Sequence, residues 1–332
     1  MKLKRIFLLI VVVCFLLAGV FAWQLLKPLP ITKQIDIQIP TRTTISKATD
    51  ILAEKKAISS PFIFKWSAKI YATLYGKGLY AGYYRFSAHQ SHWQLLRSIF
   101  SGKQSFTVNV VFPEGISLTK FASIAAKQVG IDSTEFMKLA TSDSLLRARN
   151  IKGKSVEGFI MPDTYNFFWK QPVGEVLDKL LDEQDRIWTD KFAALAKKAD
   201  KTRREILTLA SIVESETPQP DERSRIAGVY INRISKNMKL EADPTVQYAL
   251  GEQRHLLYRD LEIDSPYNTY KYEGLPPGPI NSPGIASIEA ALEPEKHDYI
   301  YFVATGDGDH TFSKTYTQHL KAVELYRLKR KK

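Results

Sequence analysis

The sequence contains a single cysteine in 332 residues, Cys14, which lies inside an apolar segment near the N-terminus. The rest of the chain therefore has no thiol, which excludes disulfides within it and metal sites built on thiolates. A soluble part of about 300 residues does not need such crosslinks, because the buried fraction of a chain's surface rises with its size.

Acidic residues are also scarce: 35 Asp and Glu stand against 47 Lys and Arg, a net charge of +12. This excess suits an anionic partner, such as nucleic acid, an acidic membrane surface or a polyanionic cell wall. The chain lacks a nucleic-acid recognition motif, so only nonspecific phosphate attraction would support that role. We therefore expect no nucleic-acid partner.

Charge is absent altogether from Ile6–Leu26, which follows the basic residues 1–5. At about 1.5 Å per residue this stretch can cross a hydrocarbon core of about 30 Å as one helix. The positive-inside rule places residues 1–5 in the cytoplasm and everything after Lys27 outside. A cleaved signal peptide is the alternative, supported by Val20-Phe21-Ala22, but its apolar region is usually only about 7 to 15 residues long. The sequence predicts a single-pass anchor.

A strand–helix pattern occurs twice after a short linker at 27–34. Ile35–Ile39 alternates as a half-buried strand and ends at Pro40, and a second such strand, 107–112, ends at Pro113. Laying Pro40 over Pro113 superposes Thr44 on Ser117, Ile45 on Leu118, Ala48 on Phe121, Ile51 on Ile124, Ile58 on Ile131 and Ser60 on Ser133. Each copy thus predicts a strand, a capped helix and a second capped helix.

Between the copies, 81–86 predicts a strand, and 91–100 predicts a helix closed by Gly102. Two copies are too few for a solenoid, so 35–150 is interpreted as a small α+β module. It resembles LysM-type glycan-binding units. A spacer between membrane and catalytic domain is the alternative interpretation.

The remainder, 151–332, has helical patterns at 173–198 and 202–216, further helices among loops rich in Pro and Gly, and a last strand at 299–304. It predicts a mainly helical domain with some β structure. The expected fold class of the whole chain is α+β.

One predicted helix carries paired carboxyl groups. Thr202 and Glu205 have capping-box spacing, and Glu214 and Glu216 fall in the last turn before Pro218. An apolar stripe runs along this helix through Ile206, Leu209, Ala210 and Val213. A carboxyl group held against apolar walls keeps its proton to higher pH and can act as a general acid. The pattern alone equally allows two surface residues in a fraying turn.

The run Leu209–Thr217 resembles the signature of the YceG-like family, the endolytic murein transglycosylases. Its Glu-Ser pair is similar to that of goose-lysozyme-like lytic transglycosylases, whose glutamate is catalytic. Further blocks resemble the same family, at 157–165, 225–233, 240–246, 265–270 with 274–280, and 309–312. With the anchor, the resemblance covers nearly the whole chain.

The resemblance implies a lyase reaction on peptidoglycan. One glutamate protonates the oxygen between N-acetylmuramic acid and N-acetylglucosamine, then deprotonates the muramic acid C6 hydroxyl, which attacks C1 and leaves a 1,6-anhydro end. A second catalytic carboxylate is then unnecessary. Alignment with the Glu-Ser pair gives this role to Glu214, with Glu216 as the second choice.

The expected substrate-binding residues lie in the family blocks: Ser215, Glu157, Asp163, Asp243, Tyr267, Asn268, Tyr270 and His310. Tyrosine and asparagine side chains offer flat faces and hydrogen bonds to sugars. Asp243 before Pro244 equally suits a turn, and a lone histidine such as His310 is more often structural. Asp307 and Asp309 lack the other ligands of a calcium loop, so we expect no metal, and no cofactor.

The resemblance also implies a location and partners. It implies a bacterial cytoplasmic (inner) membrane protein with its catalytic domain outside, acting on nascent glycan strands as a terminase of elongation. Peptidoglycan synthases are candidate partners. Two alternatives stay open: a hydrolytic muramidase on the same scaffold, and a non-catalytic peptidoglycan-binding scaffold.

Overall fold

The computed structural model describes residues 2–40, 42–102 and 106–330. Met1 of the predicted cytoplasmic N-terminus and residues 331–332 of the predicted catalytic domain lie outside the described residues. The chain divides into two compact units. Unit 1 comprises 1–109, 128–131 and 166–172, and unit 2 comprises 110–127, 132–165 and 173–332. The mixed helix and strand content expected from the sequence is confirmed.

Unit 1 begins with helix α1, Lys2–Leu26, which contains the apolar stretch Phe7–Leu26. By length and composition this stretch is able to cross a membrane, and signal sequences share that character. The apolar helix predicted at 6–26 is therefore present.

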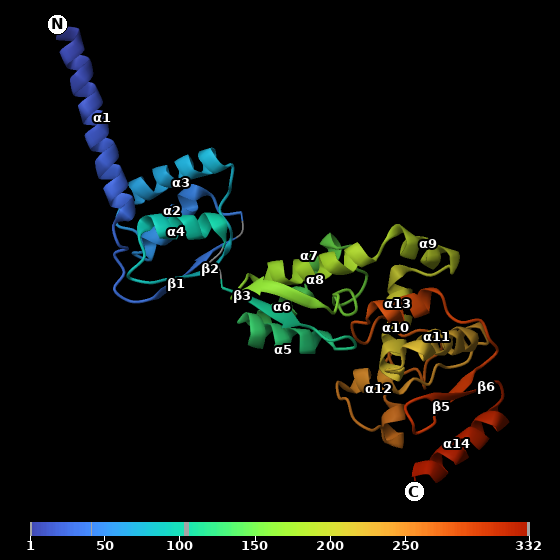
Figure 1. Cartoon of the computed structure of the whole chain (residues 1–332). Helices are drawn as coiled ribbons and strands as arrows, with labels where there is room; N and C mark the ends of the chain where they lie inside the picture. Colours follow the sequence, from blue (N-terminus) through green and yellow to red (C-terminus); the bar gives the residue numbers. More distant parts are fainter. Residues whose placement is uncertain (1, 41, 103–105, 331–332) are drawn as a thin grey trace. The chain divides into compact units, whose positions relative to one another are not determined.

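The body of unit 1 is a two-stranded antiparallel sheet covered by helices (Figure 1). Strand β1, Ile35–Ile39, pairs with β2, Gly82–Phe86, so that Ile37 lies opposite Tyr84. Three helices pack with this sheet: α2 (Ile45–Glu54), α3 (Pro61–Tyr75) and α4 (His92–Ser101). Each begins at a capping hydroxyl, from Thr44, Ser60 and Ser91 respectively.

The segment predicted as a linker, 27–34, contributes two side chains to the core of unit 1. Leu29 and Ile31 are buried there. The Leu29 amide donates to the Gln90 carbonyl at 2.8 Å, and the His92 amide donates to the Lys27 carbonyl at 3.3 Å. The chain therefore packs into unit 1 directly after α1 ends.

The part of the chain after α4 repeats the strand–helix–helix order of β1, α2 and α3. Strand β3, Thr107–Val111, is followed by α5 (Leu118–Val129), α6 (Ser133–Ala140) and α7 (Asp143–Ala148), then by β4, Thr164–Phe168, its partner strand. Helix α8, Val173–Ile187, packs against α6. Residues 110–127 and 132–150 of the predicted module 35–150 belong to unit 2 and the rest of it to unit 1, so the module is divided between the units.

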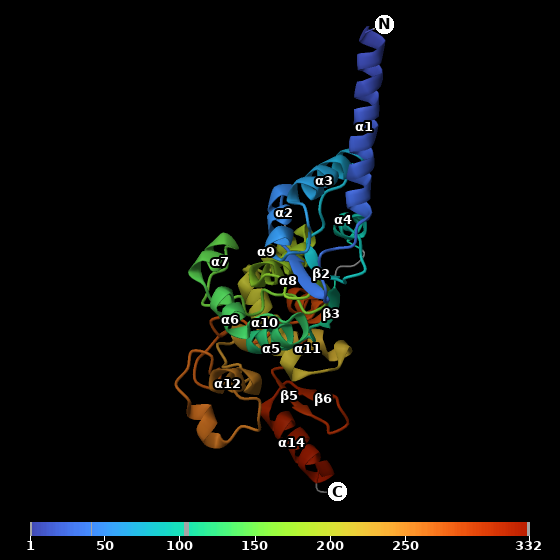
Figure 2. The same cartoon turned by 90° about the vertical axis from the view of Figure 1, so that its left-hand side faces the viewer.

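The rest of unit 2 is built around α10, Arg203–Glu216 (Figures 1 and 2). Its neighbours are α9 (Asp190–Lys198), α11 (Pro220–Ser235), α12 (Asp243–Leu250) and α13 (Ile285–Leu292). The remaining elements are the 3₁₀ helix η1 (Tyr258–Glu262), the antiparallel pair β5 (Tyr301–Ala304) and β6 (His310–Ser313), and α14 (Tyr316–Arg330). All residues from Ile206 to Val213 are buried, so α10 is enclosed on every side.

Helix α11 approaches the 295–297 segment so closely that only glycine fits between them. A Cβ at Gly228 would lie 2.4 Å from the Glu295 carbonyl oxygen and 2.6 Å from His297 Nε2. We expect Gly228→Ala to lower the free energy of unfolding by about 1 to 3 kcal/mol through overpacking. Thermal unfolding of the purified protein measures this change.

Gly174→Ala is the matched control, because its Cβ would meet only Leu139 Cδ2, at an ordinary 3.7 Å. Its helical position makes the melting temperature equal to or slightly above that of the wild type. Equal melting temperatures for the two variants would contradict the tight contact at Gly228.

Candidate active site

Glu214 lies in the last turn of α10, where two donors hold its carboxylate. The turn between α10 and α11, residues 217–219, is short and the two helices are in contact, which brings Arg223 alongside Glu214. Arg223 Nη2 donates to Glu214 Oε1 at 3.2 Å, and the Gly284 amide donates to Oε2 at 3.0 Å. Both side chains are nearly buried, with 7% of Glu214 and 10% of Arg223 exposed.

A second carboxyl group, Glu114, approaches the same arginine from the turn after β3. Glu114 Oε2 lies 3.9 Å from Arg223 Nη1. Burial and the charge of Glu214 raise the pKa of Glu114, while Arg223 lowers it. The guanidinium group of Arg223 therefore forms ion pairs with two carboxyl groups.

Two glycines allow this close approach. Gly115 has φ +72°, a left-handed conformation that other residues rarely adopt, and a Cβ there would lie 3.3 Å from Glu214 Cγ. A Cβ at Gly284 would lie 2.0 Å from the Glu114 carboxyl group. Side chains at either position would displace the paired glutamates.

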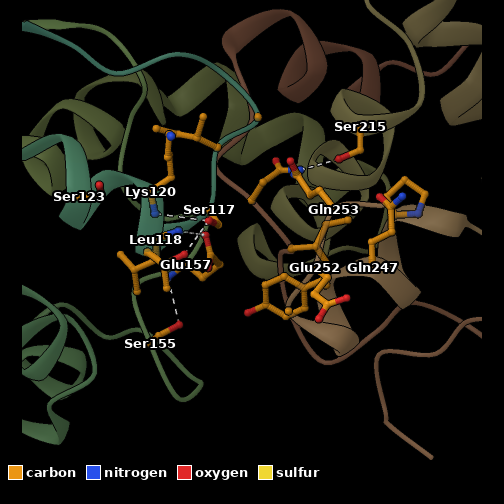
Figure 3. A pocket seen from close by; sticks show the side chains of 18 of the residues that line it. Ser117, Leu118, Lys120, Ser123, Ser155, Glu157, Ser215, Gln247, Glu252 and Gln253 are labelled. Carbon is orange, nitrogen blue, oxygen red and sulfur yellow. Dashed lines mark hydrogen bonds between the residues drawn. The ribbon is translucent and has the colours of Figure 1, made fainter. Parts of the chain in front are cut away.

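The two glutamates line a cavity of about 620 Å³ together with Gly115, Ser215, Gln247, Gln253, Arg254 and His255. A neighbouring cavity of about 830 Å³ shares Gly115, Ser215, Gln247 and Gln253 with it. In Figure 3, Ser117, Lys120 and Glu157 face Ser215, Gln247 and Gln253 across this second cavity. Hydroxyl and amide groups of this kind suit hydrogen bonding to sugars.

Glu157, predicted to bind substrate, lies in the wall of the larger cavity. It is buried, and its Oε1 accepts a hydrogen bond from the Leu118 amide at 2.9 Å, at the start of α5. Burial raises the pKa of Glu157 to about 8, which the Leu118 bond opposes. The carboxyl group of Glu157 is thus mostly protonated, and therefore neutral, below about pH 8.

The loop rich in proline and glycine is fixed to α10. Asn281 Nδ2 donates to Ser215 Oγ at 2.7 Å and to the Ser211 carbonyl at 2.9 Å, and the Ile280 amide donates to Ser211 Oγ at 3.1 Å. Arg204 Nε donates to the Pro277 carbonyl at 2.7 Å. These bonds set the position from which the Gly284 amide reaches Glu214.

Glu216, the second candidate acid, has a different environment. The Tyr230 hydroxyl donates to its Oε1 at 2.6 Å. Burial raises the pKa of Glu216 to about 7, and the Tyr230 bond opposes that rise. Glu216 lines neither of the two cavities described above.

The other predicted substrate residues make contacts within the protein. The Tyr270 hydroxyl donates to Asp243 at 2.6 Å, and Asn268, fully buried, donates to the Leu261 and Ile263 carbonyls. These bonds shape the loop that follows η1.

Three further predicted residues lie near β strands or aromatic rings. His310 Nδ1 lies 2.7 Å from Glu222 Oε2, which ties β6 to α11. Asp163, exposed before β4, accepts from the Thr164 amide at 2.6 Å. The Tyr267 ring lies 4.8 Å from that of Tyr248, which lines the larger cavity.

Arg223, Glu114 and Asn281 were not predicted from the sequence. Arg223 could have been, since a turn of three residues keeps the start of α11 close to the end of α10, where Glu214 lies. Glu114 and Asn281 carry no such signal, because they are distant in the sequence. Among the residues that the structure describes, no group of three or more His, Cys, Asp or Glu could hold a metal ion.

Comparisons with known proteins agree on one family. The YceG-like family matches residues 37–325. An endolytic murein transglycosylase of Bacillus subtilis is 33% identical over 308 residues, covering 88% of this chain and 84% of the relative. One from Streptococcus pneumoniae is 28% identical, covering 82% of this chain and 54% of the relative. The crystal structure of a YceG-like protein from Listeria monocytogenes has 34% identity and a TM-score of 0.60, covering 87% of this chain and 98% of that one.

The raised pKa of Glu157 predicts a pH-dependent stability. A carboxyl group with a raised pKa in the folded state stabilises fully below its unfolded pKa, and this stabilisation is lost as pH rises through about 8. We expect the wild type to lose up to about 1.4 kcal/mol per pH unit across this window. Glu157→Gln, whose amide oxygen still accepts from Leu118, should flatten the curve.

Melting temperatures of both proteins between about pH 5 and about pH 9 test this expectation. Parallel curves for wild type and variant would show that Glu157 is not the titrating group.

Proposed function

Because the chain belongs to the YceG-like family, we propose that it is an endolytic peptidoglycan lytic transglycosylase in which Glu214 is the catalytic acid and base. The relatives are named endolytic murein transglycosylases, and this lyase-type cleavage of peptidoglycan is the activity of the chain. The observation that carries the assignment to Glu214 is its carboxyl group, held by Arg223 and the Gly284 amide at the edge of a polar cavity.

The proposed reaction needs one carboxyl group in two protonation states. Glu214 gives its proton to the glycosidic oxygen as the bond from C1 of N-acetylmuramic acid breaks. The resulting carboxylate takes the proton of the C6 hydroxyl, whose oxygen bonds to C1. The proton balance closes without water, and the product carries a 1,6-anhydro ring. Arg223 and the Gly284 amide stabilise the carboxylate stage, since both donate to it.

Glu114 contributes to the charge balance around this group. When both carboxyl groups are ionised, Glu114, Glu214 and Arg223 carry one net negative charge; Glu214 and Arg223 are nearly buried, and Glu114 is half-exposed. The raised pKa of Glu114, to which burial and the charge of Glu214 both contribute, reflects this crowding of negative charge.

The residues that line the two cavities, and those predicted to bind substrate, are proposed to have two kinds of role. Ser215, Gln247 and Gln253 line both cavities, which supports direct contact with sugar hydroxyl and acetamido groups. Glu157 adds a neutral acid to the larger cavity. For the remaining predicted residues, including Asp163 and Tyr267, substrate contact stays a prediction. The internal bonds of Asp243, Asn268, Tyr270 and His310 support a role in shaping the loops.

Paired substitutions separate the two candidate acids. Glu214→Gln should lower glycan cleavage by about 10² to 10⁴-fold, the usual contribution of a general acid or base. Glu216→Gln should keep most activity, because the amide oxygen still accepts from Tyr230. Mass spectrometry of digested glycan strands measures both rates and identifies the ends.

Anhydro ends are expected with the wild type, whereas reducing ends would establish the muramidase alternative. Retained glycan binding without any cleavage would favour the scaffold alternative. Loss of activity only in Glu216→Gln would transfer the catalytic role to Glu216.

The location and cellular role are also proposals. We propose that α1 anchors the chain in the bacterial cytoplasmic membrane with its N-terminus inside, and that cleavage ends nascent strands beside the synthases. The apolar stretch Phe7–Leu26 supports the anchor. Two helices between paired strands, as in β1-α2-α3-β2, support the LysM-like interpretation and a glycan-binding role for this part.

Replacing residues 1–26 by a cleavable signal peptide tests the role of anchoring. We expect activity on isolated peptidoglycan to be retained, because the candidate active site lies wholly in unit 2. Glycan strands in cells should lengthen, as they do not meet the enzyme where they emerge. Unchanged strand length in cells that carry only the released form would contradict the terminase role.

A further inference from the structure

An apolar stripe on α3 is exposed to solvent, whereas the opposite face of the helix packs into the core of unit 1. The stripe consists of Phe62, Trp66, Ile70 and Leu74, spaced four residues apart, with exposed fractions of 70%, 48%, 47% and 74%. On the opposite face of α3, Phe64 and Ala68 are buried in the core. Large exposed apolar patches of this kind mark interaction sites.

The polar groups within and beside the stripe suit a membrane interface. Thr73, which lies within the stripe on a helical projection, donates its hydroxyl to the Lys69 carbonyl at 3.0 Å, so it needs no water. Lys65 and Lys69 border one edge, and Lys69 Nζ lies 5.2 Å from the Trp66 ring centroid. Helix α3 contains no acidic residue. Tryptophan with lysine beside an apolar face is typical of helices that lie at the bilayer surface.

Helix α3 occupies the side of unit 1 from which α1 extends. In Figures 1 and 2, α3 lies beside the C-terminal end of α1, and β1 and β2 lie on the opposite side. Helix α1 also packs directly against α3 and α4. The solvent-exposed face of α3 therefore lies on the same side of unit 1 as the end of the apolar stretch of α1.

Helix α1 continues into the core of unit 1 without a flexible segment between them. Lys27 Nζ lies 4.1 Å from the Trp23 ring centroid, a pairing expected at a membrane boundary. Only two residues further on, Leu29 is buried and bonded to Gln90. A membrane that contains α1 must therefore lie directly against this side of unit 1.

We propose that α3 is an interfacial helix, with Phe62, Trp66, Ile70 and Leu74 inserted among the headgroups and upper acyl chains of the bilayer that holds α1. Lys65 and Lys69 then meet acidic lipid headgroups. The anchor thus has two parts, one helix across the membrane and one along its surface. The inference depends on α1 as a membrane span and is independent of the catalytic role of Glu214.

Depth-dependent quenching of a fluorescent label in the full-length protein tests this inference. The background variant is Cys14→Ser, which removes the single native thiol. One label is attached through Ile70→Cys on the stripe. The matched control is Arg85→Cys on β2, an exposed position whose ion pair with Asp36 contributes little stability. Both proteins are reconstituted in phosphatidylethanolamine–phosphatidylglycerol vesicles containing a lipid with a nitroxide on the upper acyl chain.

We expect the label at position 70 to lose most of its fluorescence and the label at position 85 to lose little. Equal quenching at the two positions would overturn the proposal and leave the stripe for a protein partner. A second variant adds Phe62→Gln, Trp66→Gln and Leu74→Gln to the Ile70→Cys protein. These residues are exposed, so the fold is retained, and quenching should fall to the level of position 85. Full quenching in this variant would show that α1 alone holds α3 close to the membrane. This result would also overturn the proposal.

Discussion

The burial of the middle of α10 determines the geometry of the candidate active site. From Ile206 to Val213 every residue of this helix is enclosed by neighbouring helices, so the helix can neither rotate nor shift without disrupting the core of unit 2. Glu214 follows directly after this enclosed stretch. A side chain in a terminal helical turn, which would ordinarily fray, is thereby held at a fixed position beside the cavity.

This rigid position allows distant parts of the chain to meet at one carboxyl group. Arg223 comes from the following helix, the Gly284 amide from the loop fixed to α10, and Glu114 from the turn after β3. Gly115 and Gly284 leave the necessary space. Electrostatic stabilisation is effective when donors need not reorganise, and here the surrounding core supplies that preorganisation. The same enclosure separates the two neighbouring glutamates, since Glu216 meets Tyr230 instead.

Local patterns in the sequence predicted local features well. The capping box at Thr202, the strand at Ile35–Ile39, the capped helix at Ser91 and the apolar N-terminal helix are all present. Contacts between distant residues were not predictable, because neither periodicity nor spacing determines which loops meet. Glu114 beside Arg223 and Asn281 beside Ser215 are of this kind. The burial of Leu29 was also missed, since a segment with two prolines suggests an exposed linker.

The burial of Leu29 and Ile31 has a consequence for the proposed attachment of the protein to the membrane. Proteases that shed surface proteins cut extended, accessible chain between an anchor and the folded part. Here that stretch is hydrogen-bonded to the residues before α4 and packed into the core of unit 1. Leu29 and Ile31 are buried, whereas Pro28, Pro30 and residues 32–34 are exposed. If α1 spans the membrane as proposed, release of the protein after a cut in this stretch would also require the contacts of Leu29 and Ile31 with unit 1 to break.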